Sequence, residues 1–112
     1  MAETTPTRST TPARVVSTHS TRAVLAAFLV EPDRELYGLQ LLAHTGLHSG
    51  TLYPILRRLH GRGWLTSRPE DVDPRQESRP RRRYYRLTAA GADHARTYLA
   101  AHHAYVTREG TR

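Results

Sequence analysis

The sequence predicts a mainly α-helical protein with one small β-hairpin. Apolar residues recur at helical spacing in four segments, and the alternation of apolar and polar residues that is typical of a strand lies between the third and the fourth. Glycines and prolines separate these segments. The length of 112 residues corresponds to a single small domain.

The first predicted helix covers residues 18–30. Its apolar residues recur four apart and share a face, Thr18 or Ser20 provides the N-cap, and Pro32 ends the helix. Residues 1–17, which precede it, are rich in threonine and show no periodicity. We expect them to form a disordered tail that carries a few arginines.

Two further helices follow, with a short turn between them. Residues 36–44 form the second predicted helix, which Thr45 and Gly46 end, and residues 49–60 form the third. In the third helix, apolar residues at spacings of three and four mark the face directed at the core: Leu52, Ile55, Leu56 and Leu59.

The start of the third helix contains an N-cap candidate and a proline. Ser49 is the candidate because its hydroxyl can accept a hydrogen bond from an unpaired backbone amide. Pro54 has no amide hydrogen and removes one bond of the helix. We therefore expect an irregular first turn, or a regular helix that begins nearer Thr51.

Residues 64–68 and 83–87 are the predicted strands of the hairpin. In the second strand Tyr84 and Tyr85 point to opposite faces, and we expect Tyr84 to lie outside. Residues 69–82 between the strands hold three prolines and eight charged residues and have nothing to bury. A loop this long in so small a domain is typically functional or disordered.

The last predicted helix covers residues 89–107, with Thr88 as its N-cap. It carries two neighbouring stripes of moderately apolar residues, and it has no later element to pack against. Members of these stripes are the candidates for a dimer interface, or for a ligand pocket on a two-fold axis: Tyr98, Leu99, His102, Tyr105 and Val106.

This order of elements is that of a winged helix-turn-helix with an added C-terminal helix. The turn of the motif centres on Thr45, Gly46 and Leu47. In such a fold the third helix enters the major groove of DNA and the charged hairpin reaches the backbone or the minor groove. We expect residues 18–88 to form the DNA-binding domain and residues 89–112 to form a dimerisation helix.

The charge distribution supports DNA as the partner. The net charge is +7, and all 17 basic residues are arginines. Residues 57–86 contain ten arginines against four acidic residues, which accounts for nearly all of the excess. An arginine fork binds phosphate or guanine with two hydrogen bonds. The candidate DNA contacts are Tyr37, Ser49, Thr51, Tyr53, Arg57, Arg58, Arg79, Arg81, Arg82 and Arg83.

Other classes of protein fit the sequence less well. No run approaches the about 18 apolar residues of a membrane span, and the N-terminus has no apolar core of a secretory signal. There is no cysteine, and neither a nucleophile constellation nor a phosphate-binding glycine loop is present. We expect a cytoplasmic protein that is not an enzyme and holds no cofactor or metal.

Four stretches carry a family resemblance. They are LYGLQL at 36–41, SGTLYPILRRL at 49–59, GWL at 63–65 and RPRRRYYRLT at 79–88. This pattern resembles the PadR family of bacterial transcriptional regulators over about two-thirds of the chain. With only 24 residues after Thr88, the chain resembles the short subfamily with a single C-terminal helix.

The resemblance implies a homodimeric repressor whose C-terminal helices cross between subunits and whose third helix and wing contact an inverted-repeat operator. It also implies a possible small-molecule effector of unspecified identity. Ser78 stands where many members of the family have glycine. Three other functions compete: a non-specific architectural nucleic-acid binder, a protein–protein docking module that has lost DNA binding, and a metal-responsive regulator of the ArsR type. The candidate metal ligands lie on the last helix: Asp93, His94, His102 and His103.

Overall fold

The structure, a computed structural model, describes residues 18–110, and the side chains of residues 18–103. It confirms the mainly helical fold class with a small antiparallel sheet. The predicted tail, residues 1–17, lies outside the described residues. The elements are α2 (His19–Leu29), β1 (Leu36–Tyr37), α3 (Gly38–Thr45), α4 (Ser49–Gly61), β2 (Leu65–Pro69), α5 (Pro74–Glu77), β3 (Arg83–Leu87) and α6 (Ala89–Gly110).

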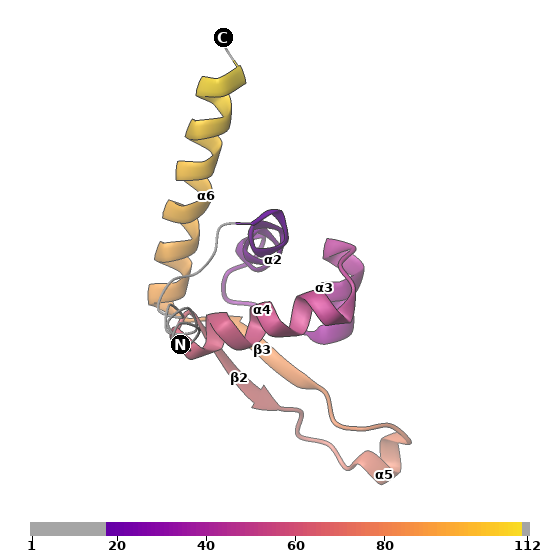
Figure 1. The fold of residues 1–112 in the computed structure, drawn as a ribbon. Coiled ribbons are helices and arrows are strands. Elements are labelled where there is room, and N and C mark those ends of the chain that lie inside the picture. Colours follow the sequence, from indigo (N-terminus) through magenta and orange to yellow (C-terminus); the bar gives the residue numbers. More distant parts are fainter. Residues whose placement is uncertain (1–17, 111–112) are drawn as a thin grey trace, which may run out of the picture.

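Helices α2, α3 and α4 pack together, and two long extensions leave this body in different directions (Figure 1). One extension is the wing, formed by β2, β3 and the loop with α5 at its tip. The other is α6, which extends from the end of β3 past the body of the protein. The wing and α6 therefore meet at the root of the sheet, which fixes one relative to the other.

The core lies where the predicted apolar faces of the first three helices meet. Thr18, one of the two predicted N-cap candidates, caps α2 by accepting a hydrogen bond from the amide of Thr21 at 3.0 Å. The large side chains that are fully buried come from α2, α3 and α4: Phe28, Leu25, Val24, Leu41, Leu52, Leu56 and Leu59. Burial of each such side chain contributes about 1.5–3 kcal/mol.

The start of the second predicted helix is wrong. Leu36 and Tyr37 form a short strand, β1, that pairs antiparallel with Tyr85 and Tyr84 of β3. The sheet therefore has three strands in the order β1-β3-β2 rather than two. The amide of Tyr37 donates to Oε1 of Gln40 at 3.0 Å, so the chain turns into α3 immediately after the strand.

The predicted N-cap of the third helix is also wrong. His48 is the capping residue, without a side-chain bond, and Ser49 is the first residue of α4. The carbonyl of His48 accepts from the amides of both Thr51 and Leu52, so a regular helix starts before Thr51. Pro54 is accommodated because it removes only one bond close to an exposed helix start, where water can hydrate the carbonyl left unpaired.

Helix α6 docks on the root of the wing through a close backbone contact. Thr88 caps it as predicted, because its Oγ1 accepts from the amide of Gly91 at 2.9 Å. An added Cβ on Gly91 would overlap the carbonyl of Trp64. Trp64 is a core residue, as predicted, with 7% of its surface exposed, and its indole stacks on the ring of His94.

Replacing Gly91 with alanine tests this docking contact. The new methyl group would push α6 away from Trp64, and overpacking of this kind costs about 1–3 kcal/mol of unfolding free energy. The matched control is Gly61→Ala, because a Cβ at Gly61 meets no atom within 4 Å. Alanine there is expected to be neutral or to stabilise by up to about 1 kcal/mol. Urea unfolding followed by circular dichroism measures both, and equal stabilities would contradict the contact.

Candidate nucleic-acid interface

Helix α4 separates an apolar face from a polar one. Its four predicted core residues are buried, whereas the polar candidates at its start and one turn later are exposed: Ser49, Thr51, Tyr53, Arg57 and Arg58. Because the core holds the opposite side, the polar face is held outward along the first turns of the helix. This is the side on which the first residues of a recognition helix meet base edges and phosphates.

The two candidate tyrosines both pack on neighbouring elements. The hydroxyl of Tyr53 lies directly over Gly38 at the start of α3, where any larger residue would collide with it. Tyr53 nevertheless keeps 37% of its surface exposed. Tyr37 is half-buried, with its ring edge-on to Tyr84 at 5.7 Å. The guanidinium of Arg82 lies 4.2 Å from the centre of the Tyr37 ring, so Tyr37 connects α3 to the wing.

Glu70, directly after β2, binds residues on the other side of the wing loop. Its carboxylate accepts two hydrogen bonds from the guanidinium of Arg79, at 2.7 and 3.0 Å, and a third from the amide of Arg82 at 3.0 Å. The side chain is only 10% exposed. These bonds favour the charged form, those from Arg79 most strongly, and they lower the pKa of Glu70 from 4.5 to about 2.

The prediction that residues 69–82 have nothing to bury is wrong. Glu70 is buried and α5 is ordered within residues 69–82. Ser78 ends α5 with a φ of 57°, in the left-handed region that favours glycine. Two nitrogens of Arg79 are bound to Glu70, so the structure places Arg79 in an internal ion pair.

Two further arginines of the wing, Arg81 and Arg83, are each held by a hydrogen bond within the wing. Nε of Arg81 donates to the carbonyl of Val72 at 2.9 Å, and Nη1 of Arg83 donates to Oγ of Ser67 at 3.1 Å. These bonds leave other nitrogens of each exposed guanidinium available. The fixed side chains have less conformational entropy to lose on binding an anion.

A hollow of about 280 Å³ lies where the three elements meet. Its lining comes from the start of α3, the start of α4 and the wing: Tyr37, Gly38, Leu39, Tyr53, Arg81, Arg82, Arg83 and Tyr85. Three arginines and three tyrosines are therefore gathered beside the exposed face of α4. This chemistry suits a phosphate group, which offers several acceptor oxygens to fork donors.

The sequence profile of the transcriptional regulator PadR-like family matches residues 29–97. The chain belongs to the PadR-like family. A PadR family transcriptional regulator from Eggerthella lenta is 31% identical, with a TM-score of 0.63 and coverage of 79% of this chain and 78% of that one. The protein smu.1704 from Streptococcus mutans is 25% identical, with a TM-score of 0.62 and 83% of each chain covered.

A PadR-like transcription factor from Bacteroides fragilis shares the fold, with 21% identity, a TM-score of 0.65 and coverage of 81% and 86% of the two chains. No curated protein matches the sequence. The family consists of transcriptional regulators, and this PadR-like chain carries its winged-helix fold.

The predicted residues of the C-terminal helix are only partly described. Among the described residues the buried hydroxyl of Tyr98 has no hydrogen-bond partner, Leu99 packs against the core, and His102 is half-buried. The side chains of Tyr105 and Val106 lie outside the described residues. Among the described residues, no group of three or more histidine and acidic side chains could hold a metal ion.

The structure adds residues that the sequence did not single out. Arg68 binds Glu35 through two hydrogen bonds of 2.7 Å, which lower the pKa of that carboxyl, and Glu70 holds the wing tip. Leu39 is 66% exposed beside the arginines. No local pattern marks Glu35 or Glu70, because their partners are distant in sequence.

Within residues 18–110 no helix is long and apolar enough to cross a membrane.

The Glu70 ion pair predicts an unusual titration. The pKa of Glu70 is lowered in the folded protein. The contribution of this carboxylate to the free energy of unfolding is therefore complete above the unfolded pKa of 4.5 and is lost as the pH falls toward about 2. Side-chain carboxyl ¹³C chemical shifts should therefore give a midpoint near 2. In Arg79→Gln the midpoint should rise toward 4.5, whereas Arg75→Gln should leave it unchanged. A midpoint near 4.5 in the unmodified protein would contradict the ion pair.

Proposed function

We propose that this PadR-like protein is a sequence-specific DNA-binding repressor. It acts in the cytoplasm as a homodimer on an inverted-repeat operator and is released by a small molecule. Membership of the family supports a transcriptional regulator that binds DNA. The DNA contacts and the dimer are inferred from the arrangement of α4, the wing and α6.

One observation carries the proposal: the exposed polar face of α4 lies beside a hollow lined by three wing arginines. In our proposal α4 enters the major groove, and Ser49 and Thr51 approach base edges there. Arg81, Arg82 and Arg83 bind backbone phosphates, which fixes the register of α4 without reading sequence. The proposed role of Arg79 is to position these neighbours through Glu70.

The rest of α4 and the two tyrosines complete the proposed contact surface. Arg57 and Arg58 follow the polar start of the helix by one turn and are exposed, so that they reach the backbone or a base edge deeper in the groove. Tyr53 keeps enough exposed surface to contact a sugar or phosphate while it packs on Gly38. Tyr37 acts mainly by supporting Arg82.

The proposed dimer uses α6. This helix extends past the body (Figure 1), and its two moderately apolar stripes include the predicted interface residues Tyr98, Leu99, His102, Tyr105 and Val106. The side chains of Tyr98 and His102 each keep part of their surface exposed, which supports this assignment because a second copy of α6 can cover that surface. The paired helices would place two recognition helices for adjacent half-sites.

Selection from fragmented genomic DNA at about physiological salt tests the function. Recovery of one palindromic motif, with half-sites about one helical turn apart, is expected of a dimeric regulator. Featureless fragments would instead indicate an architectural binder, and no recovery would overturn DNA binding. A variant with Thr51→Val should still bind DNA but discriminate less between the motif and random sequence, since it loses a hydroxyl that reads bases.

Removing two wing arginines tests the phosphate contacts. Arg81→Ala/Arg83→Ala should weaken binding to every sequence, and the slope of log affinity against log salt should flatten by about 0.9 for each phosphate that the variant no longer neutralises. The control Arg62→Ala/Arg96→Ala removes the same charge from exposed sites outside the hollow. Fluorescence anisotropy over a series of salt concentrations measures both, and equal slopes in the two variants would refute the assignment.

A pair of adjacent histidines tests the dimer interface. His102 is half-buried on the proposed interface stripe, whereas its neighbour His103 is exposed and points about 100° away around the helix. His102→Asp should convert dimer to monomer, because it places like charges near the two-fold axis. His103→Asp should stay dimeric. Sedimentation velocity gives the mass of each, and dimers in both variants would place the interface elsewhere.

A further inference from the structure

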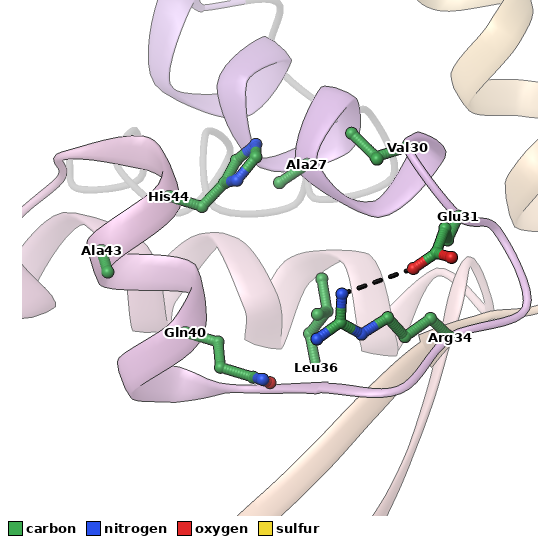
Figure 2. Close-up of a pocket in the computed structure, with 8 residues that line it drawn as sticks. All are labelled: Ala27, Val30, Glu31, Arg34, Leu36, Gln40, Ala43 and His44. Atoms are coloured by element: carbon green, nitrogen blue, oxygen red, sulfur yellow. Dashed lines mark hydrogen bonds and ion pairs between the residues drawn. The ribbon is translucent and has the colours of Figure 1, made fainter.

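A cleft between α2 and α3 is separate from the DNA-facing hollow. It has a volume of about 400 Å³, which lies within the usual range for small-molecule sites. Figure 2 shows its eight lining residues, which come from the end of α2, the following connection, β1 and α3: Ala27, Val30, Glu31, Arg34, Leu36, Gln40, Ala43 and His44.

The cleft combines an apolar floor with a rim that carries the Arg34–Glu31 ion pair. Ala27 and Ala43 are small and leave the space open, and Val30 is 68% exposed, so water contacts aliphatic surface there. Arg34 lies on the rim opposite His44 (Figure 2). An apolar body would displace that water, and an anionic group on the same molecule would meet a positive charge.

The guanidinium of Arg34 has nitrogens that can donate further hydrogen bonds. Among the described residues, its guanidinium is held by a single bond, from Nη1 to Oε1 of Glu31 at 3.3 Å. Both side chains of this ion pair are more than half exposed, so the pair contributes little to stability. Nε and Nη2 of Arg34 can therefore bind a second acceptor without disruption of the fold.

The cleft and the DNA-facing hollow share one segment of chain. Leu36 and Gln40 line the cleft, whereas Tyr37, Gly38 and Leu39, which lie between them, line the hollow. A molecule wedged against Leu36 and Gln40 would displace the start of α3. That displacement would move Gly38 from beneath the Tyr53 hydroxyl and Tyr37 from its contact with Arg82.

We propose that the α2–α3 cleft is an effector site for a small apolar molecule that carries one anionic group, and that its occupation weakens DNA binding. The apolar body lies between Ala27, Leu36 and Ala43, and the anion binds Arg34. The regulatory half of this proposal rests on the proposed function. Since linkage is reciprocal, DNA must weaken binding of the effector by the same factor.

A fluorescent probe tests the site directly. 1-Anilinonaphthalene-8-sulfonate has an apolar body and one anion, and N-phenyl-1-naphthylamine is the same body without the sulfonate. Saturable binding of the sulfonate at one site per chain is expected. Arg34→Gln should weaken its binding by about tenfold, the loss expected for a charge-assisted hydrogen bond, and should change binding of the neutral probe little.

Two variants control this experiment. Arg96→Gln removes an arginine from an equivalent exposed i,i+3 ion pair outside the cleft and should leave both affinities unchanged. Ala43→Phe fills the cleft and should abolish binding of both probes; Ala43 is exposed, and circular dichroism confirms that the variant folds. Unchanged sulfonate affinity in Arg34→Gln and Ala43→Phe would overturn the site.

The regulatory half is tested with labelled operator DNA. The sulfonate probe should reduce DNA affinity in the unmodified protein and have no effect in Ala43→Phe. If the reduction persists in Ala43→Phe, the probe competes on the arginines of the wing and the proposal fails. If the probe occupies the cleft and DNA affinity is unchanged, regulation is refuted while DNA binding stands. If no DNA binds even without probe, the proposed function fails, and cleft binding is judged from fluorescence alone.

Discussion

The pairing of β1 with β3 is the constraint on which the arrangement of the site depends. Only two residue pairs are involved, Leu36 with Tyr85 and Tyr37 with Tyr84, but they join the helical body to the wing. Apart from them, the wing is tied to the body by its root beside α4 and by the ion pair of Arg68 with Glu35. With them, the start of α3, the start of α4 and the wing arginines occupy fixed positions around one hollow.

Acidic residues hold several of the basic ones in place. The wing is strongly cationic, yet Glu70 binds Arg79 and the backbone of Arg82, and Glu35 binds Arg68. These pairs reduce the mutual repulsion of the arginines and fix where the remaining guanidinium groups lie. Fixing side chains in advance lowers the entropy lost when an anion binds. The few acids in this region therefore organise the cationic surface.

The sequence was sufficient to predict the elements whose signals are local. Four apolar periodicities, the Thr18 and Thr88 caps and the alternation in β3 placed the helices and the hairpin, since each depends on residues close in sequence. The two-residue strand β1 was missed because it is too short to have a period. Its identity is set by pairing with a strand that lies more than 40 residues later.

The candidate site was predictable by residue type but not by partner. Arginine density and the polar start of the third helix predicted the candidate surface, because composition is visible in one sequence. Five of the candidates line one hollow: Tyr37, Tyr53, Arg81, Arg82 and Arg83. Which arginine is exposed and which binds an acid depends on the folded wing. Arg79 and Arg81 are indistinguishable in sequence, although one binds Glu70 and the other the carbonyl of Val72.

The contact of Gly91 with Trp64 has a mechanical consequence. Helix α6 has 22 residues, a length of about 33 Å, and it is held close to its first turn by the residue that leads directly into β2. The helix is therefore held at one end, at the root of the wing, while its other end lies far from this contact. A tilt of about 5° that moves its far end about 3 Å would press the first turn of α6 against Trp64, so a change imposed at the end of the helix would be felt where β2 begins.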